Sequence, residues 1–238
     1  MACNGKVEAA RGLVNEFSDH IREARIVGVG TGSTTALALR EAARQGLLDG
    51  KVLVASSIST ALMLADLGFK PVMPHVVSGI DFYFDGADEV VIDGLHLLKG
   101  RGGALLGEKI LAHSSTMRVY VVDDSKLVPK LGSRRALPLE VTPWALAHVL
   151  SELRRLGYSA APRVSGGKDS PVTSDWGGIV VDVETGPMED PAALDCRLKS
   201  IPGVVETGIF VGLADAVVVG SANCGYRVVW RDKGDRRQ

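Results

Sequence analysis

The sequence predicts an α/β protein in which a Rossmann-like parallel-sheet domain is joined to a smaller, ferredoxin-like α+β domain. Apolar strand segments alternate with helical segments over the first 133 residues, which is the pattern of a parallel sheet built from βαβ units. From about residue 136 the order changes to strand, helix, strand, strand, helix, strand, which is typical of a split βαβ fold. The length of 238 residues also fits one domain with a smaller one appended.

The first domain is expected to begin with an amphipathic helix over 6–24, where apolar residues recur at helical spacing. The strand at 80–84 is apolar on both faces, as the central strand of a helix-covered sheet must be. The other elements expected here are strands at 26–29, 52–55, near 71–77 and at 117–122, and helices at 36–48, 59–67 and around Glu108.

The second domain is expected over 134–208. Two final strands should rejoin the first domain, which then comprises 1–133 and 209–238. The elements expected in and after the second domain are strands at 137–141, 159–164, 178–184 and 204–210, helices at 143–156 and 190–200, and the final strands at 214–220 and 226–231.

Polar side chains follow four of the strands in the first domain. The four segments read GTGST from Gly30, SSIST from Ser56, DGAD from Asp85 and DDSK from Asp123. In a parallel sheet these strand ends open on the same edge, where ligands of α/β proteins usually bind. Together they favour a shared pocket for a phosphorylated polyol.

The stretch 79–112 concentrates carboxylates, a lysine and glycines between apolar segments. Asp85 and Asp88 come directly after the central strand, and the glycines that follow Lys99 allow the backbone to approach a ligand closely. Glu108 lies in the first or second turn of the next helix. The positive end of that helix should help keep the carboxylate ionised, which is the state a general base requires.

The turn at 30–34 has three possible interpretations. A glycine turn before a helix presents N–H groups and hydroxyls to an anion such as phosphate, but it could also be a tight turn with an ordinary Ser or Thr N-cap. A dinucleotide site is disfavoured, because Ser33 replaces the third glycine and hydroxyls replace the acid expected after the second strand. We therefore favour the interpretation that this turn binds an anion.

Composition narrows the possible partners. The 27 basic and 28 acidic residues are balanced, with no basic run before the tail at 231–237, which argues against nucleic acid. Cys3, Cys196 and Cys224 are odd in number and lack ligand or framework spacing, which favours a reducing cytosol and argues against structural zinc. The five His are scattered, so no metal site is expected. Because there is neither a signal peptide nor an apolar span, we expect a cytoplasmic protein.

With these residues in view, the chain resembles the type A ribose-5-phosphate isomerases. The resemblance runs nearly end to end, through VGVGTGST, DGADEV, KGRGGAL with EK, DDSK, LPLEV and IPGVVETGIF. It implies interconversion of D-ribose 5-phosphate and D-ribulose 5-phosphate through an enediolate, in the non-oxidative pentose phosphate pathway. It also implies that no metal and no organic cofactor takes part.

The resemblance assigns roles to residues of this chain. Glu108 would be the base that moves the proton between C1 and C2, and Lys99 would stabilise the enediolate oxygen. Asp85 and Asp88 would hold the sugar hydroxyls and help ring opening. The full set of substrate-binding residues implied in this way is Thr31, Gly32, Ser33, Thr34, Asp85, Gly86, Ala87, Asp88, Lys99, Gly100, Arg101, Gly102 and Lys126.

The chain departs from the family pattern in a few places. Arg101 stands where many members have glycine, and TSDWGG at 173–178 replaces a segment like TDNGN. The N-terminus is shifted, so the resemblance assigns no residue of the helix at 6–24. Glu140 and Trp144 are interpreted as domain-packing or subunit-contact residues. The small βαββαβ sheet should have one face that its own helices leave uncovered, which predicts a homodimer or homotetramer.

Two other functions deserve comparison. A non-catalytic sugar-phosphate sensor would keep the phosphate turn without needing Glu108 and Lys99, and would usually carry a DNA-binding module for which this chain has no room. For a nicotinamide-dependent dehydrogenase, the sequence lacks the third glycine of the turn and the acid expected after the second strand. Both are weaker than the isomerase.

Overall fold

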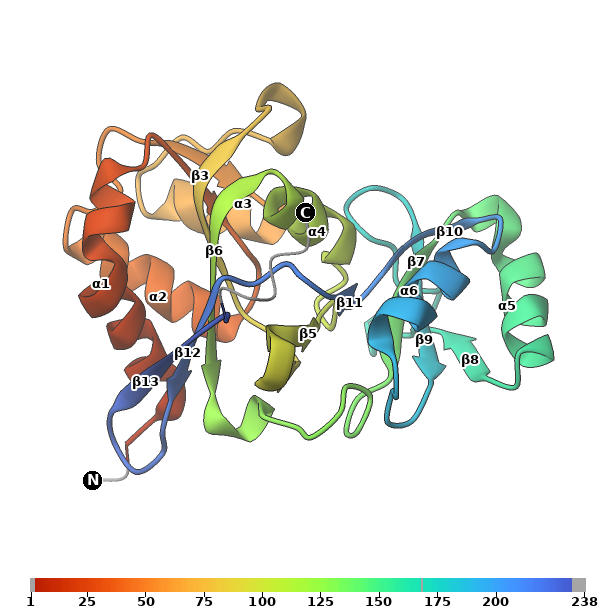
Figure 1. The fold of residues 1–238 in the computed structure, drawn as a ribbon. Helices are drawn as coiled ribbons and strands as arrows, with labels where there is room; N and C mark the ends of the chain where they lie inside the picture. The colour runs from red at the N-terminus through yellow and green to blue at the C-terminus, as the bar shows by residue number, and fades with distance from the viewer. Residues whose placement is uncertain (1–2, 168, 233–238) are drawn as a thin grey trace.

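The computed structural model describes residues 3–167 and 169–232, and within them a six-stranded sheet forms the centre of the molecule (Figure 1). The strand order is β13-β12-β6-β3-β1-β2, and every pairing is parallel except that of β12 with the edge strand β13. The strands are β1 (Ile26–Val29), β2 (Val52–Ala55), β3 (Ile80–Asp85), β6 (Ser115–Asp123), β12 (Ala216–Gly220) and β13 (Tyr226–Trp230). The mostly parallel sheet confirms the predicted fold class.

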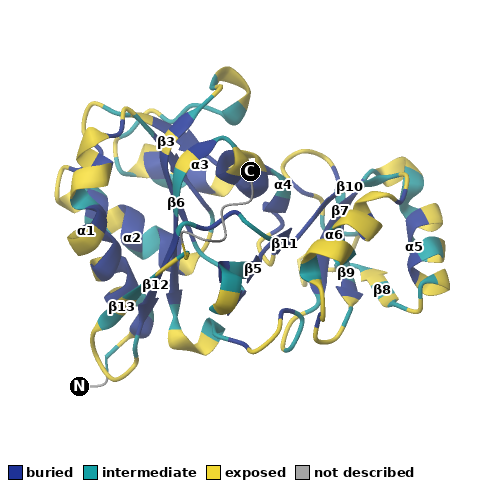
Figure 2. Ribbon diagram, in the orientation of Figure 1, coloured by how far each residue is buried: buried dark blue, intermediate teal, exposed yellow. Residues whose placement is uncertain are grey.

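Helices cover both faces of this sheet. On one face, Phe82 and Phe84 of β3 share a core with α1 (Gly5–Glu23), α2 (Ser33–Arg44) and α3 (Ile58–Asp66). Because side chains alternate along a strand, Tyr83 points to the other face, where it shares a core with α4 (Leu105–His113). Figure 2 shows the result as buried strands between helices whose outer sides are exposed. The prediction that β3 is apolar on both faces is therefore confirmed.

A four-stranded sheet with order β10-β7-β9-β8 forms the second unit within the described residues. Residues of this sheet share a core with α5 and α6, and the element order is the predicted βαββαβ. The elements are β7 (Leu137–Val141), α5 (Leu146–Arg155), β8 (Ser159–Pro162), β9 (Ile179–Glu184), α6 (Pro191–Lys199) and β10 (Val204–Thr207). The domain boundaries at 133/134 and 208/209 stay a prediction.

Helix α4 links the two units. It contacts β3 and β6 of the central sheet and also β7 and β10 of the second sheet (Figure 1). A buried ion pair fixes the contact with β10, with 2.8 Å between Lys109 Nζ and Glu206 Oε1. Side chains of β7 and β9 that point away from α5 and α6, such as Pro138 and Val180, lie against the glycine loop at 99–103. As predicted, the helices of this unit leave that face uncovered, and the glycine loop of the first unit covers part of it.

Several predicted elements have different bounds. Residues 71–77, all of them described, give a bridge between Val72 and Val54 and a 3₁₀ turn (Pro74–Val76) instead of a strand. The predicted strand at 204–210 divides at Gly208 into β10 and β11 (Ile209–Phe210), because Gly208 N–H donates to Pro138 while its carbonyl accepts from Lys99 N–H. Strand β11 joins β5 (His96–Leu98) and β4 (Glu89–Val91) in a small sheet that the sequence did not reveal.

The cysteine prediction is wrong in one respect. Cys3 and Cys224 form a disulfide between residues 221 positions apart, while Cys196 is free and exposed. Helix α1 packs on β12 and brings the N-terminus beside the β12–β13 turn, so spacing along the chain could not indicate this pair. Most of the predicted basic tail, from residue 233 onward, lies outside the described residues. Within them, every helix is too short or too polar to span a membrane.

Candidate active site

The carboxyl ends of β1, β3 and β6 meet at one edge of the central sheet, beside a cavity of about 300 Å³. Most of the residues singled out from the sequence line it. They are Thr31, Gly32, Ser33, Thr34, Gly86, Ala87, Asp88, Lys99, Gly100, Arg101, Gly102, Glu108 and Lys126. Lys6 and Thr35 also line it and were not expected.

The SSIST segment lies behind the cavity wall and supports it. Ser56, Ser57 and Thr60 are almost completely buried. Their hydroxyl oxygens lie 2.9, 2.7 and 3.1 Å from Thr31 Oγ1, and they fix the side chain that faces the cavity. The expectation that all four strand ends face the ligand is therefore wrong for this one.

The turn between β1 and α2 has the features of an anion site. Gly32, with φ of +144°, is the N-cap of α2 and, within the described part of the chain, no side chain caps this helix. Ser33 and Thr34 begin the helix and face the cavity with its positive end. This geometry favours the anion interpretation over an ordinary Ser or Thr cap. Lys6, at the start of α1, adds an ammonium 3.0 Å from Ser33 Oγ.

Asp85 lies behind the cavity wall, fully buried at the end of β3. Its Oδ1 accepts hydrogen bonds from the N–H groups of Thr31 (3.0 Å) and Gly86 (2.7 Å) and from the Thr35 hydroxyl (3.3 Å). Its Oδ2 accepts from the Tyr83 hydroxyl at 2.5 Å and lies 2.7 Å from Lys99 Nζ. Because Asp85 is fully buried and five protein groups contact its two oxygens, the carboxylate holds the wall together; its predicted contact with the sugar stays a prediction.

Asp88 is the carboxylate of this strand end that faces the cavity. Its Oδ2 accepts a hydrogen bond of 3.0 Å from the backbone N–H of Arg101, which ties the β3 end to the glycine loop. Its remaining oxygen capacity can serve hydroxyl groups of a ligand.

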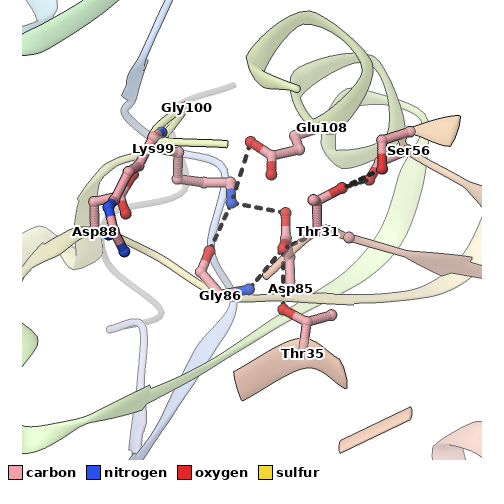
Figure 3. Close-up of polar contacts among 12 residues, drawn as sticks. Thr31, Thr35, Ser56, Asp85, Gly86, Asp88, Lys99, Gly100 and Glu108 are labelled. Atoms are coloured by element: carbon pink, nitrogen blue, oxygen red, sulfur yellow. Dashed lines mark hydrogen bonds and ion pairs between the residues drawn. The ribbon is translucent and has the colours of Figure 1, made fainter. Parts of the chain in front are cut away.

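Lys99 and Glu108 form the buried centre of the site (Figure 3), with exposures of 2% and 3%. Lys99 Nζ lies 2.6 Å from the Gly86 carbonyl oxygen and 3.4 Å from Glu108 Oε2. One ammonium therefore serves two buried carboxylates, and the shorter contact goes to Asp85. Burial alone would lower the pKa of Lys99, but Asp85 and Glu108 outweigh it and raise that pKa.

Glu108 carries a strongly perturbed carboxyl group. It lies in the first turn of α4, as predicted, but burial raises its pKa from 4.5 to about 8, although Lys99 opposes that shift. Asp85 and Asp88 add to the increase by repulsion. The expected ionisation by the helix dipole, worth about 0.3–1 kcal/mol, is too weak to compensate for burial. A carboxyl with this pKa can both remove and return a proton near neutral pH.

Sequence comparison places these residues in a known family. A family model for ribose 5-phosphate isomerase A (phosphoriboisomerase A) matches residues 52–224. The ribose-5-phosphate isomerase A of Aeropyrum pernix is 46% identical over 232 residues, covering 98% of each chain. That of Thermomicrobium roseum is 42% identical over 215 residues, covering 90% of each.

Solved structures agree in fold. Ribose 5-phosphate isomerase A from Methanocaldococcus jannaschii superposes with a TM-score of 0.86 at 33% identity, covering 94% of this chain and 97% of its own. A D-ribose-5-phosphate isomerase in complex with phospho-erythronic acid gives 0.87 at 33% identity, with coverage of 96% and 100%. From its sequence and its fold alike, the chain belongs to the ribose 5-phosphate isomerase A family.

Proposed function

We propose that this protein interconverts D-ribose 5-phosphate and D-ribulose 5-phosphate through an enediolate. The observation that carries the proposal is the buried Lys99–Glu108 pair beside a cavity whose other wall is a helix N-terminus suited to phosphate. Family membership supports the same activity. The related isomerase in complex with phospho-erythronic acid supports a sugar phosphate as the ligand, because that compound carries a phosphate on a short polyol chain.

In the direction from aldose to ketose, the Glu108 carboxylate takes the proton from C2 of the open-chain sugar. The electron pair of that C–H bond forms the C1–C2 double bond, and the carbonyl electrons move onto O1. Glu108, now protonated, gives the proton to C1, while the hydroxyl hydrogen passes from O2 to O1. Atoms and electrons balance within the substrate, and the enzyme returns to its starting state.

Lys99 acts on the oxygen that becomes negative. Its ammonium is held by Asp85 and by the Gly86 carbonyl, so little reorganisation is needed when charge develops. A positioned donor of this kind contributes roughly 10²–10³-fold to the rate. Asp85 acts through Lys99 as a positioning residue, and Asp88 binds the sugar hydroxyls and assists ring opening.

The phosphate binds at the N-terminus of α2. Ser33 and Thr34 offer hydroxyls and N–H groups there, and Lys6 and Lys126 line the same cavity with two ammonium groups. Arg101, which lines the cavity on the glycine loop, adds a third cation. The cations favour an anionic over a neutral sugar.

The compartment and assembly belong to the same proposal. The enzyme acts in the cytoplasm, in the non-oxidative pentose phosphate pathway, as a homodimer or homotetramer. The Cys3–Cys224 disulfide withdraws the cysteine pattern as support for this compartment, which is proposed from the pathway alone. Trp144 supports self-association, because 99% of its surface is exposed in the single chain and an indole of this kind is typical of subunit contacts. Glu140 belongs to internal packing instead, since it is buried and accepts a 2.5 Å hydrogen bond from Ser174.

Formation of ribulose 5-phosphate from ribose 5-phosphate by the purified protein tests the proposal. Lys99→Met should lose most turnover, because the oxyanion loses its donor. Lys51→Met is the matched control, since Lys51 donates to carbonyls of Arg22 and Ala24 near the end of α1 and contacts no part of the cavity lining. Unphosphorylated D-ribose should be a poor substrate. A wild-type protein that leaves ribose 5-phosphate unchanged would contradict the proposal.

A further inference from the structure

The glycine loop at 99–103 forms a thin wall between two hollows. Gly100, Arg101 and Gly102 line the active-site cavity on one side. On the other side, Arg101 and Asp88 line a second cavity of about 340 Å³, together with Arg163 and Asp182 of the second unit. Pro138 and Val180 pack against the glycines of the loop, but at Arg101 the loop has open space on both sides, so packing alone does not hold it there.

Arg163 supplies a polar anchor for this loop. Its Nη1 donates hydrogen bonds to the carbonyl oxygens of Gly100 (3.0 Å) and Arg101 (2.7 Å). Its Nε and Nη2 donate to the two carboxylate oxygens of Asp182, at 2.8 and 2.5 Å. The guanidinium therefore links β9 to the loop through four hydrogen bonds. Because the group is planar and rigid, any rotation of it would break at least one of these bonds.

The anchor itself is rigid. The backbone N–H of Arg163 donates to Val180 of β9, and the Arg163 carbonyl accepts from Val172. Asp182 lies two residues after Val180 on the same face of β9, the face on which Val180 contacts Gly103. Arg163 and Asp182 thus project from a paired region of the second sheet directly onto the loop.

The loop position matters because Lys99 immediately precedes the two carbonyls that Arg163 binds. Gly100 is buried with φ of +102°, and its carbonyl accepts from Gly103 N–H within the loop as well as from Arg163, which is its link to the second unit. Without Arg163, the Gly100 carbonyl would keep only its bond from Gly103 inside the loop, and the Arg101 carbonyl would lose its bond to the second unit. The segment directly after Lys99 would then be held less firmly.

We infer that Arg163, held by Asp182, is a positioning residue that sets the place of Lys99 opposite the reacting carbons. The inference rests on the proposed isomerase activity. It makes the second unit part of the catalytic machinery, because the side chain that fixes the loop comes from there, and it gives Arg163 a role in the chemical step without contact with substrate.

Arg163→Ala should lower kcat by roughly ten- to a hundredfold, as expected for an ångström-scale displacement of a catalytic group. The KM for ribose 5-phosphate should change by a smaller factor than kcat, since Ser33, Lys6 and Lys126 are untouched and only Arg101 moves with the loop. Glu108 faces Lys99, Asp85 and Asp88, and Lys99 is the one of these that lowers its pKa. Retreat of Lys99 should therefore move the acidic limb of the kcat/KM profile to higher pH.

Two further variants complete the design. Arg163→Lys keeps the charge but cannot make four bonds in the same geometry, so it should lie between Arg163→Ala and the wild type. It also keeps the test decisive if Arg163→Ala does not fold. Arg155→Ala is the matched control, because Arg155 forms an exposed ion pair with Glu152 on α5 of the same unit and should leave kcat and the pH profile unchanged.

Hydrogen exchange of the peptide covering 99–104 gives a readout that does not depend on activity. The N–H groups of Arg101 and Gly103, which bond to Asp88 and Gly100, should exchange faster in Arg163→Ala than in the wild type. The inference would be overturned if the folded variants had the same kcat, pH profile and exchange rates as the wild type. It would also be overturned if kcat fell only in proportion to the amount of folded protein lost. An inactive wild type would refute the isomerase proposal instead, and exchange would still decide whether Arg163 holds the loop.

Discussion

Replacing Glu108 by Gln should make the protein more stable while removing most of its activity. The carboxyl group is buried, and its pKa is raised by burial from 4.5 to about 8. The folded state favours the protonated form of Glu108. Below about pH 4.5 the group is protonated in both the folded and the unfolded chain, so its burial does not lower the free energy of unfolding. As pH rises from there towards 8, the unfolded chain ionises first and the folded state loses relative stability. Gln is nearly isosteric with the protonated acid and carries no such penalty.

The magnitude follows from the shift. At pH 7 the penalty extends over the 2.5 pH units above the ordinary pKa of 4.5, and 1.36 kcal/mol per unit gives an upper limit of about 3 kcal/mol. For a chain of this size, that corresponds to a rise in Tm of roughly 6–12 °C. Lys99 keeps Asp85 as a partner in the variant, so no buried charge is left unpaired.

Thermal unfolding at pH 5, 7 and 8 measures the effect, and turnover is measured on the same samples. The variant's advantage should grow with pH, while kcat falls by about 10²–10⁴-fold through loss of the base. If Glu108 were only a helix-start acid that complements the macrodipole, its neutralisation would cost about 0.3–1 kcal/mol and leave the rate unchanged. A variant that is less stable than the wild type at pH 7, or whose advantage is independent of pH, would refute the reasoning.

Two further predictions concern the ends of the cavity and of the chain. Lys126→Ala should raise KM more than it lowers kcat, because Lys126 lines the phosphate end of the cavity; steady-state kinetics would contradict this if kcat collapsed at unchanged KM. Cys224→Ser should lower the free energy of unfolding by up to about 5 kcal/mol, since the lost disulfide closes nearly the whole chain, without changing kcat. Equal denaturation midpoints for the variant and the wild type would show that the disulfide does not contribute.

Much of the fold could be predicted because its pattern is local. A strand apolar on both faces, glycine turns and polar strand ends were enough to indicate a parallel sheet with its ligand site at one edge. The misplaced elements are those whose conformation is set by distant contacts. Gly208 ends β10 because Pro138 and Lys99 take its hydrogen bonds, and nothing in the segment 204–210 indicates that break.

The residue types of the site could be predicted from the sequence, but which of them face the cavity and which lie behind its wall could not. Asp85 and Asp88 are alike in sequence, but only the structure shows that five partners enclose Asp85 while Asp88 faces the cavity. Lys6 escaped notice because a lysine at the start of an amphipathic helix looks like surface charge. The state of Glu108 was missed because the sequence shows its place in the helix but not its burial, which has the larger effect.

Proton exchange in D₂O tests the central claim most directly, that Glu108 moves a proton between C2 and C1 while Lys99 holds the oxyanion. Ribose 5-phosphate is incubated with EDTA-treated protein and followed by proton NMR. The wild type should form ribulose 5-phosphate and exchange the C2 proton with solvent without added metal, and Glu108→Gln should do neither although it still binds substrate. Undiminished exchange by Glu108→Gln, or exchange by the wild type that requires an added metal ion, would contradict the account.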